Sequence, residues 1–476
     1  MYVTGSRADA GHSAGYARPS AARVWTPNGA GPYPISMAQG RPSSVGDGYC
    51  LVLSGGGARG VYHIGVWRAL RELGVEVDAF VGNSIGALVA AFLAQGLESE
   101  LEAIGATIGI DTILRLPPEL VEDGELKLGP DALAGLRRLG RDLIERRGLD
   151  TGPLRDLLER HIDESAIRAA GKDLGVVAVD MGDLEPREFF LDAMEEGSLV
   201  DHLMASAAFP GFASPLIEGK PYVDGGLYDN IPYETARRRG YIKIIVVDIS
   251  GPGRNRRPAF EGSETVHIKN SVELGGAFDF DRGFLDRFEL LGYLDALRTF
   301  GRLWGYSYFL EPESAAEGEF RSRATALDPR LRARLLDPAG GAFPARMRYD
   351  RRLFLKLLEC AASSLRVERV ARYGYGSLEA AIRAARDAEE AKLAALLAPL
   401  KGGLPDAARH EAWDELVAEA LRTATLRETP YFYARLLEEL PLKLAREPLK
   451  ALLEKLVPEI EAAMMYAAIF RTDNRA

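Results

Sequence analysis

The chain has 476 residues, of which 47% are hydrophobic and 27% are charged, and its formal net charge is −10. This length accommodates two or three domains with full cores, and the composition is that of an ordinary globular protein. The acidic balance argues against general nucleic-acid binding. No run of about 20 apolar residues is present to span a membrane. The two cysteines, Cys50 and Cys360, are too few for a disulfide framework.

The first 45 residues differ from the rest of the chain, because they are rich in Gly, Ala, Ser, Pro and Arg. They contain no apolar core of a secretion signal, and they offer too little apolar surface to bury. We expect a disordered or targeting tail, or an extension upstream of a true start at Met37, and the sequence does not separate these. The expected location is cytoplasmic or peripheral to a membrane.

The first expected strand, 49–54, leads directly into a glycine-rich loop, Gly55-Gly56-Gly57-Ala58-Arg59-Gly60, and a helical segment follows. Consecutive glycines let backbone N–H groups converge on an anion or a developing oxyanion. The loop also matches the G-x-G-x-x-G fingerprint of dinucleotide sites, which requires an acidic residue at the end of the next strand. Asp78 has nearly the required spacing but precedes the core of that strand, so the oxyanion interpretation is favoured.

The arginine of the glycine loop and the arginines of two clusters could each have either a functional or a purely structural role. Arg59 provides either a positive charge beside a phosphate head group or the oxyanion, or a structural ion pair that fixes the loop. The clusters Arg237-Arg238-Arg239 and Arg254-Asn255-Arg256-Arg257 could meet anionic lipid. Such clusters are more often simply solvated, and we favour that interpretation.

The second expected strand, 77–82, ends in Gly82-Asn83-Ser84-Ile85-Gly86, and an Ala/Leu-rich helical segment, 87–94, follows. This strand–turn–helix context is what a G-x-S-x-G nucleophile elbow requires. Gly82 and Gly86 allow a tight turn that lifts the hydroxyl of Ser84 clear of the backbone. The N-terminus of the following helix then faces any negative charge that forms there. Ser84 is therefore the candidate nucleophile.

Two further segments carry polar residues that nucleophilic chemistry could use. Ala205-Ser206-Ala207-Ala208-Phe209-Pro210 reads, by itself, as a helix end halted by proline. Asp224 ends a short strand beside Gly225 and Gly226, a position from which a carboxylate can reach another loop. Most Asp-Gly pairs are simply turns, and that alternative stays open at this point.

Taken in order, the glycine loop, the elbow, the 205–210 segment and Asp224-Gly225-Gly226 resemble the motifs of the patatin-like phospholipase family. Asn230-Ile231-Pro232 also resembles the family, and the resemblance covers roughly residues 48–250. It implies a hydrolase of lipid acyl esters that uses a Ser84–Asp224 dyad, without a metal or other cofactor. It also implies an oxyanion hole and supporting glycines, which are Gly55, Gly56, Gly57, Ala58, Arg59 and Gly60, with Gly82, Gly86, Gly225 and Gly226.

The identity of the general base decides the mechanism. An aspartate has an unperturbed pKa of about 4, and burial against apolar walls raises that pKa toward a working pH near neutral. A histidine base is the alternative, because α/β-hydrolases order their triad as Ser, acid and His. No histidine that follows Asp224 has the context of a loop tip, and the one nearest to the glycine loop is His63. The candidate histidines are His63, His161, His202, His267 and His410.

Strands and helices alternate up to about residue 250, and strand-like segments also occur near 174–180, 242–248 and 264–269. The segment 243–247 is a nearly continuous apolar run, which is typical of a parallel sheet covered on both faces. We therefore expect a three-layer α/β/α hydrolase domain with a largely parallel central sheet. The aromatic residues after 262 either line an acyl-chain pocket or form plain core.

The expected organisation has three parts. The tail, 1–45, precedes a hydrolase domain at 46–320, whose core is 48–250 and whose extension is 251–320. From 325 to 476 we expect an all-α domain, because leucines recur there at helical spacing, as in Leu393, Leu396, Leu397 and Leu400.

Two functions stay open. The first is a serine lipid acyl hydrolase of phospholipase A or lysophospholipase type, with a lipid ester as substrate and peripheral contact with a membrane. The second is a non-catalytic or activator-dependent scaffold, in which the helical domain binds a protein partner or a second copy of the chain. The intact Ser84, Asp224 and glycine loop favour the first. The sequence does not name the lipid class, the sn position or the chain length.

Overall fold

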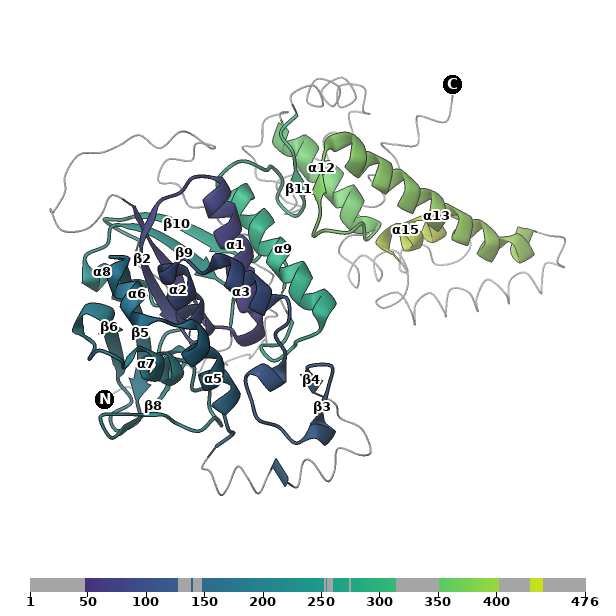
Figure 1. The fold of residues 1–476 in the computed structure, drawn as a ribbon. Helices are drawn as coiled ribbons and strands as arrows, with labels where there is room; N and C mark the ends of the chain where they lie inside the picture. The colour runs from purple at the N-terminus through teal and green to yellow at the C-terminus, as the bar shows by residue number, and fades with distance from the viewer. Residues whose placement is uncertain are drawn as a thin grey trace, which may run out of the picture.

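The computed structural model of the protein describes residues 48–126, 138–139, 148–251, 254, 260–273, 275–313, 351–401 and 429–439 (Figure 1). The expected tail with Met37, all but the first residue of the 254–257 cluster, and His410 lie outside these residues. Within the described ranges, no helix is long and apolar enough to cross a membrane. Those ranges also hold no group of three His, Cys, Asp or Glu side chains placed to bind a metal ion.

An eight-stranded sheet forms the centre of the fold, with the strand order β10-β9-β1-β2-β5-β8-β7 and with β6 paired to β5. The neighbours from β10 to β5 pair in parallel, whereas β6 and β8 pair antiparallel with β5, and β7 with β8. The expectation of a largely parallel sheet is therefore confirmed. Its strands are β1 (Tyr49–Leu53), β2 (Val77–Asn83), β5 (Asp173–Asp180), β6 (Pro186–Phe190), β7 (Leu216–Ile217), β8 (Lys220–Asp224), β9 (Lys243–Asp248) and β10 (Glu264–Lys269).

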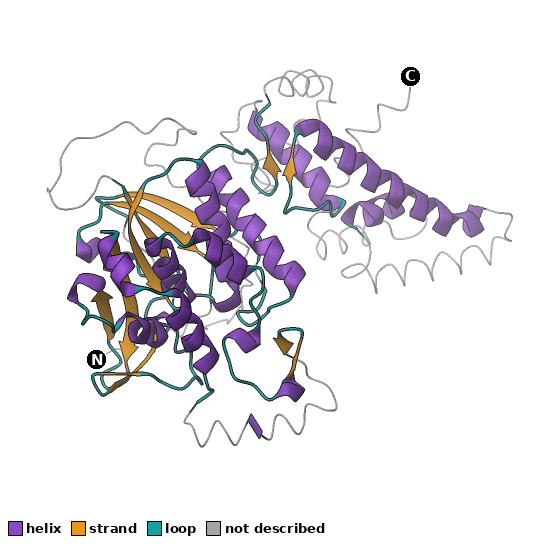
Figure 2. Cartoon of the chain, viewed as in Figure 1, coloured by secondary structure: helices purple, strands orange, loops and turns teal. Residues whose placement is uncertain are grey.

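Helices cover both faces of this sheet, which gives the expected three layers (Figures 1 and 2). Leu51 and Leu53 of β1 belong to a core cluster that includes residues of α1, α2 and α9, whereas Val52 belongs to a second cluster with Tyr233 of α8. This alternation follows from the two-residue period of a strand. The helices of the α/β part are α1 (Val61–Glu72), α2 (Ile85–Gln95), α3 (Glu98–Gly105), α5 (Gly152–His161), α6 (Glu164–Ala169), α7 (Leu199–Ser206), α8 (Tyr233–Arg239) and α9 (Arg282–Thr299).

Helices α1 and α9 cross at backbone contact. A Cβ on Gly65 of α1 would lie 1.8 Å from the carbonyl oxygen of Glu289, and one on Gly292 of α9 would lie 2.1 Å from the carbonyl oxygen of Tyr62. The hydroxyl of Tyr62 also donates to the buried carboxylate of Asp295 on α9, at 3.0 Å. The crossing thereby fixes α1, which begins directly after the glycine loop.

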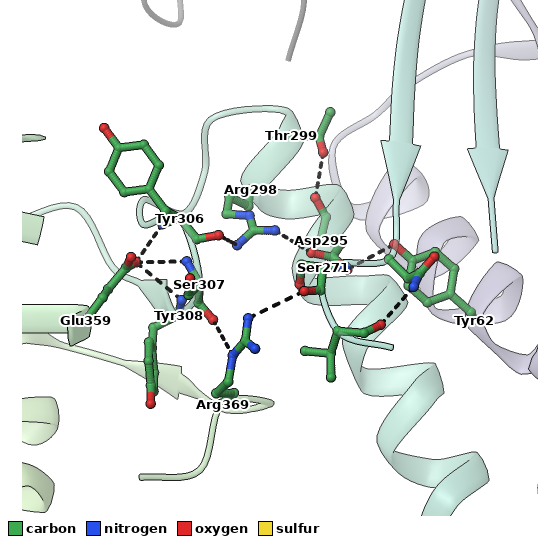
Figure 3. Close-up of polar contacts among 12 residues, drawn as sticks. Tyr62, Ser271, Asp295, Arg298, Thr299, Tyr306, Ser307, Tyr308, Glu359 and Arg369 are labelled. Atoms are coloured by element: carbon green, nitrogen blue, oxygen red, sulfur yellow. Dashed lines mark hydrogen bonds and ion pairs between the residues drawn. The ribbon is translucent and has the colours of Figure 1, made fainter. Parts of the chain in front are cut away.

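The C-terminal region is joined to the α/β part through the turn 306–308 (Figure 3). The buried carboxylate of Glu359 accepts hydrogen bonds from the three backbone N–H groups of this turn, at 2.5, 3.1 and 3.3 Å. Arg369 donates to the carbonyl oxygens of Ser307, at 3.1 Å, and Ser271, at 3.4 Å. The helices are α12 (Arg351–Ser364), α13 (Tyr375–Lys401) and α15 (Pro430–Glu439), and β11 (Phe309–Leu310) pairs with β12 (Arg372–Tyr373). The expected helical character is confirmed for these parts, apart from the two residues of β12.

Candidate active site

Ser84 occupies a strained turn between β2 and α2. Its backbone has φ 52° and ψ −129°, a left-handed φ that non-glycine residues rarely adopt. The flanking glycines permit the close approach that this turn needs. A Cβ on Gly82 would lie 2.3 Å from the carbonyl oxygen of Gly86, and one on Gly86 would lie 2.3 Å from that of Leu53. The turn has the geometry of a nucleophile elbow, with the serine immediately before the first residue of α2.

Ser206, at the end of α7, holds the backbone of this turn. The N–H group of Ser84 donates to the hydroxyl oxygen of Ser206 at 2.9 Å, and that hydroxyl donates to Oδ1 of Asn83 at 3.4 Å. Ser206 is fully buried. From the sequence, the segment 205–210 was interpreted only as a helix end. Its resemblance to a family motif was the one indication that Ser206 contacts the turn at Ser84.

Asp224, at the end of β8, lies against the hydroxyl of Ser84. The Oγ of Ser84 donates to Oδ2 of Asp224 at 2.6 Å, and the N–H group of Gly226 donates to Oδ1 at 2.7 Å. The side chain is buried, and this burial raises the pKa of Asp224 to about 6, although the two hydrogen bonds offset part of the effect. A carboxylate with this pKa is a competent general base near neutral pH.

Gly225 allows the backbone of this segment to approach β2. A Cβ on Gly225 would lie 2.4 Å from Oδ1 of Asn83, and one on Gly226 would lie 3.1 Å from Oδ1 of Asp224. The side chain of Asn83 in turn donates to the carbonyl oxygen of Asp229 at 3.0 Å. These contacts fix the loop after β8 on the end of β2.

None of the described histidines makes a hydrogen bond to Ser84 or Asp224. His63 is buried, its Nε2 lies 2.9 Å from the carbonyl oxygen of Ser54, and burial lowers its pKa to about 4. His202 bonds through Nδ1 to the carbonyl oxygen of Ser198 at 2.8 Å. His267 faces Asp248 at 3.7 Å, and the ring of His161 packs near Phe92. The histidines of the described segments are thus engaged away from the dyad.

The glycine loop follows β1 and borders the same site. The N–H group of Gly55 donates to the carbonyl oxygen of Asn230 at 3.1 Å, and that of Ala58 donates to Ala277 at 2.8 Å. Within the described residues, Gly56 and Gly57 have no such partner for their N–H groups, and both line the cavity beside Ser84. The N–H groups of Gly56 and Gly57 therefore remain available to donate to a group bound in this cavity. A Cβ on Gly60 would lie 2.3 Å from the side chain of Ile85, so Gly60 brings the loop against the elbow.

Asn230 supports the loop from a second side. Its Nδ2 donates to the carbonyl oxygen of Gly55 at 3.1 Å, and a Cβ on Gly55 would lie 2.5 Å from its Oδ1. Asn230 is buried. The sequence marked this residue only as part of the Asn230-Ile231-Pro232 resemblance and assigned it no role.

The arginines that the sequence marked as possible lipid contacts make hydrogen bonds and ion pairs within the protein. The guanidinium of Arg59 donates to the carbonyl oxygens of Ser250 and Gly275. Among the described residues, Arg59 therefore has the structural of its two expected roles, but it fixes the loop through carbonyl oxygens and not through an ion pair. Arg237 donates to the carbonyl oxygen of Tyr241, Arg238 pairs with Glu188, and Arg239 pairs with Asp173 and Asp192. The cluster 237–239 is therefore occupied by intramolecular contacts.

An apolar cavity of about 120 Å³ extends from Ser84 into the core. Each of four helices presents a stripe to it at helical spacing, and the aromatic rings of Phe209, Phe212 and Phe278 form a wall near the dyad. The ring centroids of Phe209 and Phe212 lie 5.3 and 6.3 Å from that of Phe278. The stripes are Val61 and Ile64 of α1, Ile85, Leu88, Val89 and Phe92 of α2, Leu101 and Ile104 of α3, and Leu154, Leu157 and Leu158 of α5. The cavity suits a hydrocarbon chain attached at Ser84.

Comparison with known proteins finds a family match within the α/β part. Residues 51–237 match the family model "Patatin-like phospholipase". The mouse protein named patatin-like phospholipase domain-containing protein 7 is 27% identical over 215 residues, which are 43% of this chain and 14% of that protein. Lysophospholipase NTE1 of Mycosarcoma maydis is 28% identical over 207 residues, covering 42% of this chain and 9% of that protein. These matches thus span about one seventh or less of the relatives' length.

Among solved structures, VipD from Legionella pneumophila is similar at 13% identity, covering 90% of this chain and 91% of that one. Its TM-score of 0.34 is too low to establish a common arrangement of the whole chains. The family match, the elbow and the neighbouring aspartate all fall in the α/β part described above. Residues 51–237 of this chain form a patatin-like phospholipase domain.

Proposed function

We propose that this protein is a serine hydrolase of lipid acyl esters, in which Ser84 is the nucleophile and Asp224 is the general base. The observation that carries the proposal is the 2.6 Å hydrogen bond from Ser84 Oγ to the buried Asp224 carboxylate, both of which line an apolar cavity. A serine hydroxyl is a weak nucleophile until an adjacent base accepts its proton. The raised pKa of Asp224, about 6, brings that base close to the working pH.

The reaction follows from these positions. Asp224 accepts the proton of Ser84 as Oγ attacks the ester carbonyl, and the resulting oxyanion is bound by the N–H groups of Gly56 and Gly57. Asp224 then donates the proton to the departing alcohol, and the acyl group stays on Ser84. Water enters, gives a proton to Asp224 and attacks the acyl-enzyme, and the returning proton restores Ser84 while the fatty acid leaves.

The substrate is a lipid ester of phospholipase A or lysophospholipase type, cleaved at an acyl bond. The apolar lining of the cavity supports an acyl chain as the buried part of the substrate. A relative from Mycosarcoma maydis bears the name lysophospholipase, which supports the same class. Contact with a membrane is then peripheral, since the substrate itself resides there.

We also propose the organisation expected from the sequence, with a catalytic unit at 46–320 and a helical domain at 325–476 that binds a protein partner or a second copy of the chain. The buried contact of Glu359 with the turn 306–308 supports a fixed joint between these two parts. Light scattering of the purified chain, followed by partner capture with and without 325–476, tests this arrangement. A monomer that captures nothing through this region contradicts it.

The test is fatty-acid release from a panel of phospholipids, lysophospholipids and glycerides, measured by mass spectrometry for wild type, Ser84→Ala and Asp224→Asn. We expect release by the wild type and its loss in both variants. Release that survives Asp224→Asn would contradict the dyad. Release from no lipid by a folded wild type would contradict a self-sufficient enzyme and favour the non-catalytic or activator-dependent scaffold.

A further inference from the structure

Exposed apolar side chains gather at the edge of the sheet that carries Ser84. In the described part of the chain ten large apolar side chains are exposed, and five of them belong to segments that meet at this edge. Single exposed apolar residues are ordinary, whereas a group of them in one place marks an interaction surface. The members of this group, the apolar edge, are Met181, Leu184, Leu216, Leu227 and Phe278.

Two neighbouring turns carry three of these side chains beyond the level of Ser84. Strand β2 ends directly before Ser84, and β5 continues three residues beyond its last pairing with β2, which is about 10 Å. Met181 and Leu184 follow in the turn after β5, and Leu216 lies in β7 opposite Pro221 of β8. The N–H group of Met181 donates to the carbonyl oxygen of Pro221 at 3.0 Å. The two turns therefore lie side by side and project together.

The backbone of Leu184 is strained and fixed. Its φ is 60°, in the left-handed region that bulky residues rarely adopt, and 67% of its surface is exposed. Its N–H group donates to the carbonyl oxygen of Asp180 at 2.8 Å, and the N–H group of Asp180 donates to that of Glu185 at 3.0 Å. Asp180 is itself buried. The turn thus holds a leucine toward solvent, and little burial within the described residues offsets the strain.

Phe278 connects the apolar edge to the cavity. Its side chain is 39% exposed, yet it lines the cavity together with Ser84 and Asp224. Its ring packs against those of Phe209 and Phe212. One side chain therefore faces both solvent and the cavity, so a surface that covers Phe278 from outside lies next to the site.

The charged residues of the two turns decide which lipid fits. Asp183, Glu185 and Glu218 are exposed on these turns, against one exposed cation, Lys220. Arg187 pairs with Asp183. The turns thus carry an acidic excess, and the whole chain has a net charge of −10. This charge repels an anionic lipid, so a zwitterionic lipid is the compatible partner.

We propose that the apolar edge inserts into a zwitterionic phospholipid surface and holds the cavity over the lipid from which its substrate comes. Exposed apolar side chains enter the boundary between head groups and acyl chains, and the gain grows with the apolar area removed from water. The inference rests on the proposed function and deepens it, because it assigns the face that meets the lipid. In Figure 1, β5, β6 and β8 lie on the opposite side of the α/β part from α12 and α13, so these helices leave the edge uncovered.

The test is co-sedimentation with phosphatidylcholine vesicles, measured in a Ser84→Ala parent so that the lipid stays intact. Leu184→Asn and Leu216→Asn should each weaken binding by about tenfold, because the exposed two-thirds of a leucine no longer enters the lipid. Ile242→Asn is the matched control and should bind as the parent does, since Ile242 is 46% exposed and directly precedes β9 at the opposite edge of the sheet. Leu184→Asn should unfold at the parent's temperature or above, because asparagine adopts a positive φ more readily than leucine.

No binding by the parent, equal binding by all variants, or an equal loss in Ile242→Asn would overturn the proposal. Tighter binding to vesicles that also contain phosphatidylserine would overturn its zwitterionic partner. A parent dimer that becomes a monomer in both leucine variants, with vesicle binding unchanged, would overturn the proposal in favour of a contact with a second copy of the chain. Fluorophosphonate labelling of Ser84 in the unsubstituted protein tests the proposed function separately, because it needs no vesicle. Absence of labelling would overturn the catalytic role, while vesicle binding alone decides the docking.

Discussion

The raised pKa of Asp224 predicts that its replacement by asparagine stabilises the protein while it abolishes catalysis. The pKa is about 6 in the folded protein, against an ordinary value of 3.8. The folded state therefore binds this proton more tightly than the unfolded chain does, and stability falls as pH rises from about 4 through about 6. Above that window the ionised carboxylate costs about 3 kcal/mol. Asparagine has no such proton, and its amide can still accept from Gly226 and donate toward Ser84.

The assay is urea unfolding of wild type and Asp224→Asn at pH 5 and pH 8. The stability advantage of the variant should grow by about 1.4 kcal/mol between these two pH values, because the wild-type carboxylate ionises in this range. Ser84→Ala is the control, since it keeps Asp224 but removes a hydrogen bond that lowers the pKa of this carboxyl, so its stability should still fall between pH 5 and pH 8, by at least as much as that of the wild type. An advantage of Asp224→Asn that is independent of pH, or that shrinks toward pH 8, would refute the assignment of a raised pKa.

Three further predictions concern residues that shape the site or the joint to the C-terminal region. Ser206→Ala removes the acceptor of the half-buried N–H group of Ser84 and should cost about 1–3 kcal/mol in thermal unfolding together with a drop in kcat, and an unchanged kcat would contradict its positioning role. Gly57→Ala places a Cβ 2.2 Å from a carbonyl oxygen and should lower kcat/KM by about a hundredfold or more, whereas Gly74→Ala, with a similar positive φ in open space, should keep it. Glu359→Ala leaves three N–H groups without their acceptor, and calorimetry should show a loss of about 3 kcal/mol. A loss below about 1 kcal/mol would show that this carboxylate does not anchor the turn.

Local patterns in the sequence were sufficient to predict the parallel strands of the sheet and the turn at Ser84. The segments 49–54 and 243–247 are buried on both faces of the sheet, so nearly all of their residues are apolar. This continuous apolar run is visible in the sequence alone. The Gly82-Asn83-Ser84-Ile85-Gly86 turn is likewise encoded locally, because its geometry depends on glycines within five residues. The strand β6 (Pro186–Phe190) was not expected, since all its residues are half-buried and it shows no alternation of apolar and polar positions.

Contacts between distant segments account for what the sequence left open. The hydroxyl of Ser206 meets the backbone of Ser84 across 122 residues, and Asn230 meets Gly55 across 175. The N–H group of Ala58 donates to the carbonyl oxygen of Ala277. This contact, which the sequence does not reveal, removes Ala58 from the candidate oxyanion donors. These contacts depend on how the loops pack at the edge of the sheet. The spacing of residues along the chain therefore does not predict them.

The most direct test of the Ser84–Asp224 dyad is covalent labelling with a fluorophosphonate, followed by peptide mapping. We expect one adduct on Ser84, a rate that rises with pH around an apparent pKa of about 6, and labelling slowed by about a hundredfold or more in Asp224→Asn. Ser84→Ala should not be labelled. An adduct on another residue, or an equal labelling rate in Asp224→Asn, would contradict the account of Ser84 as a nucleophile activated by Asp224.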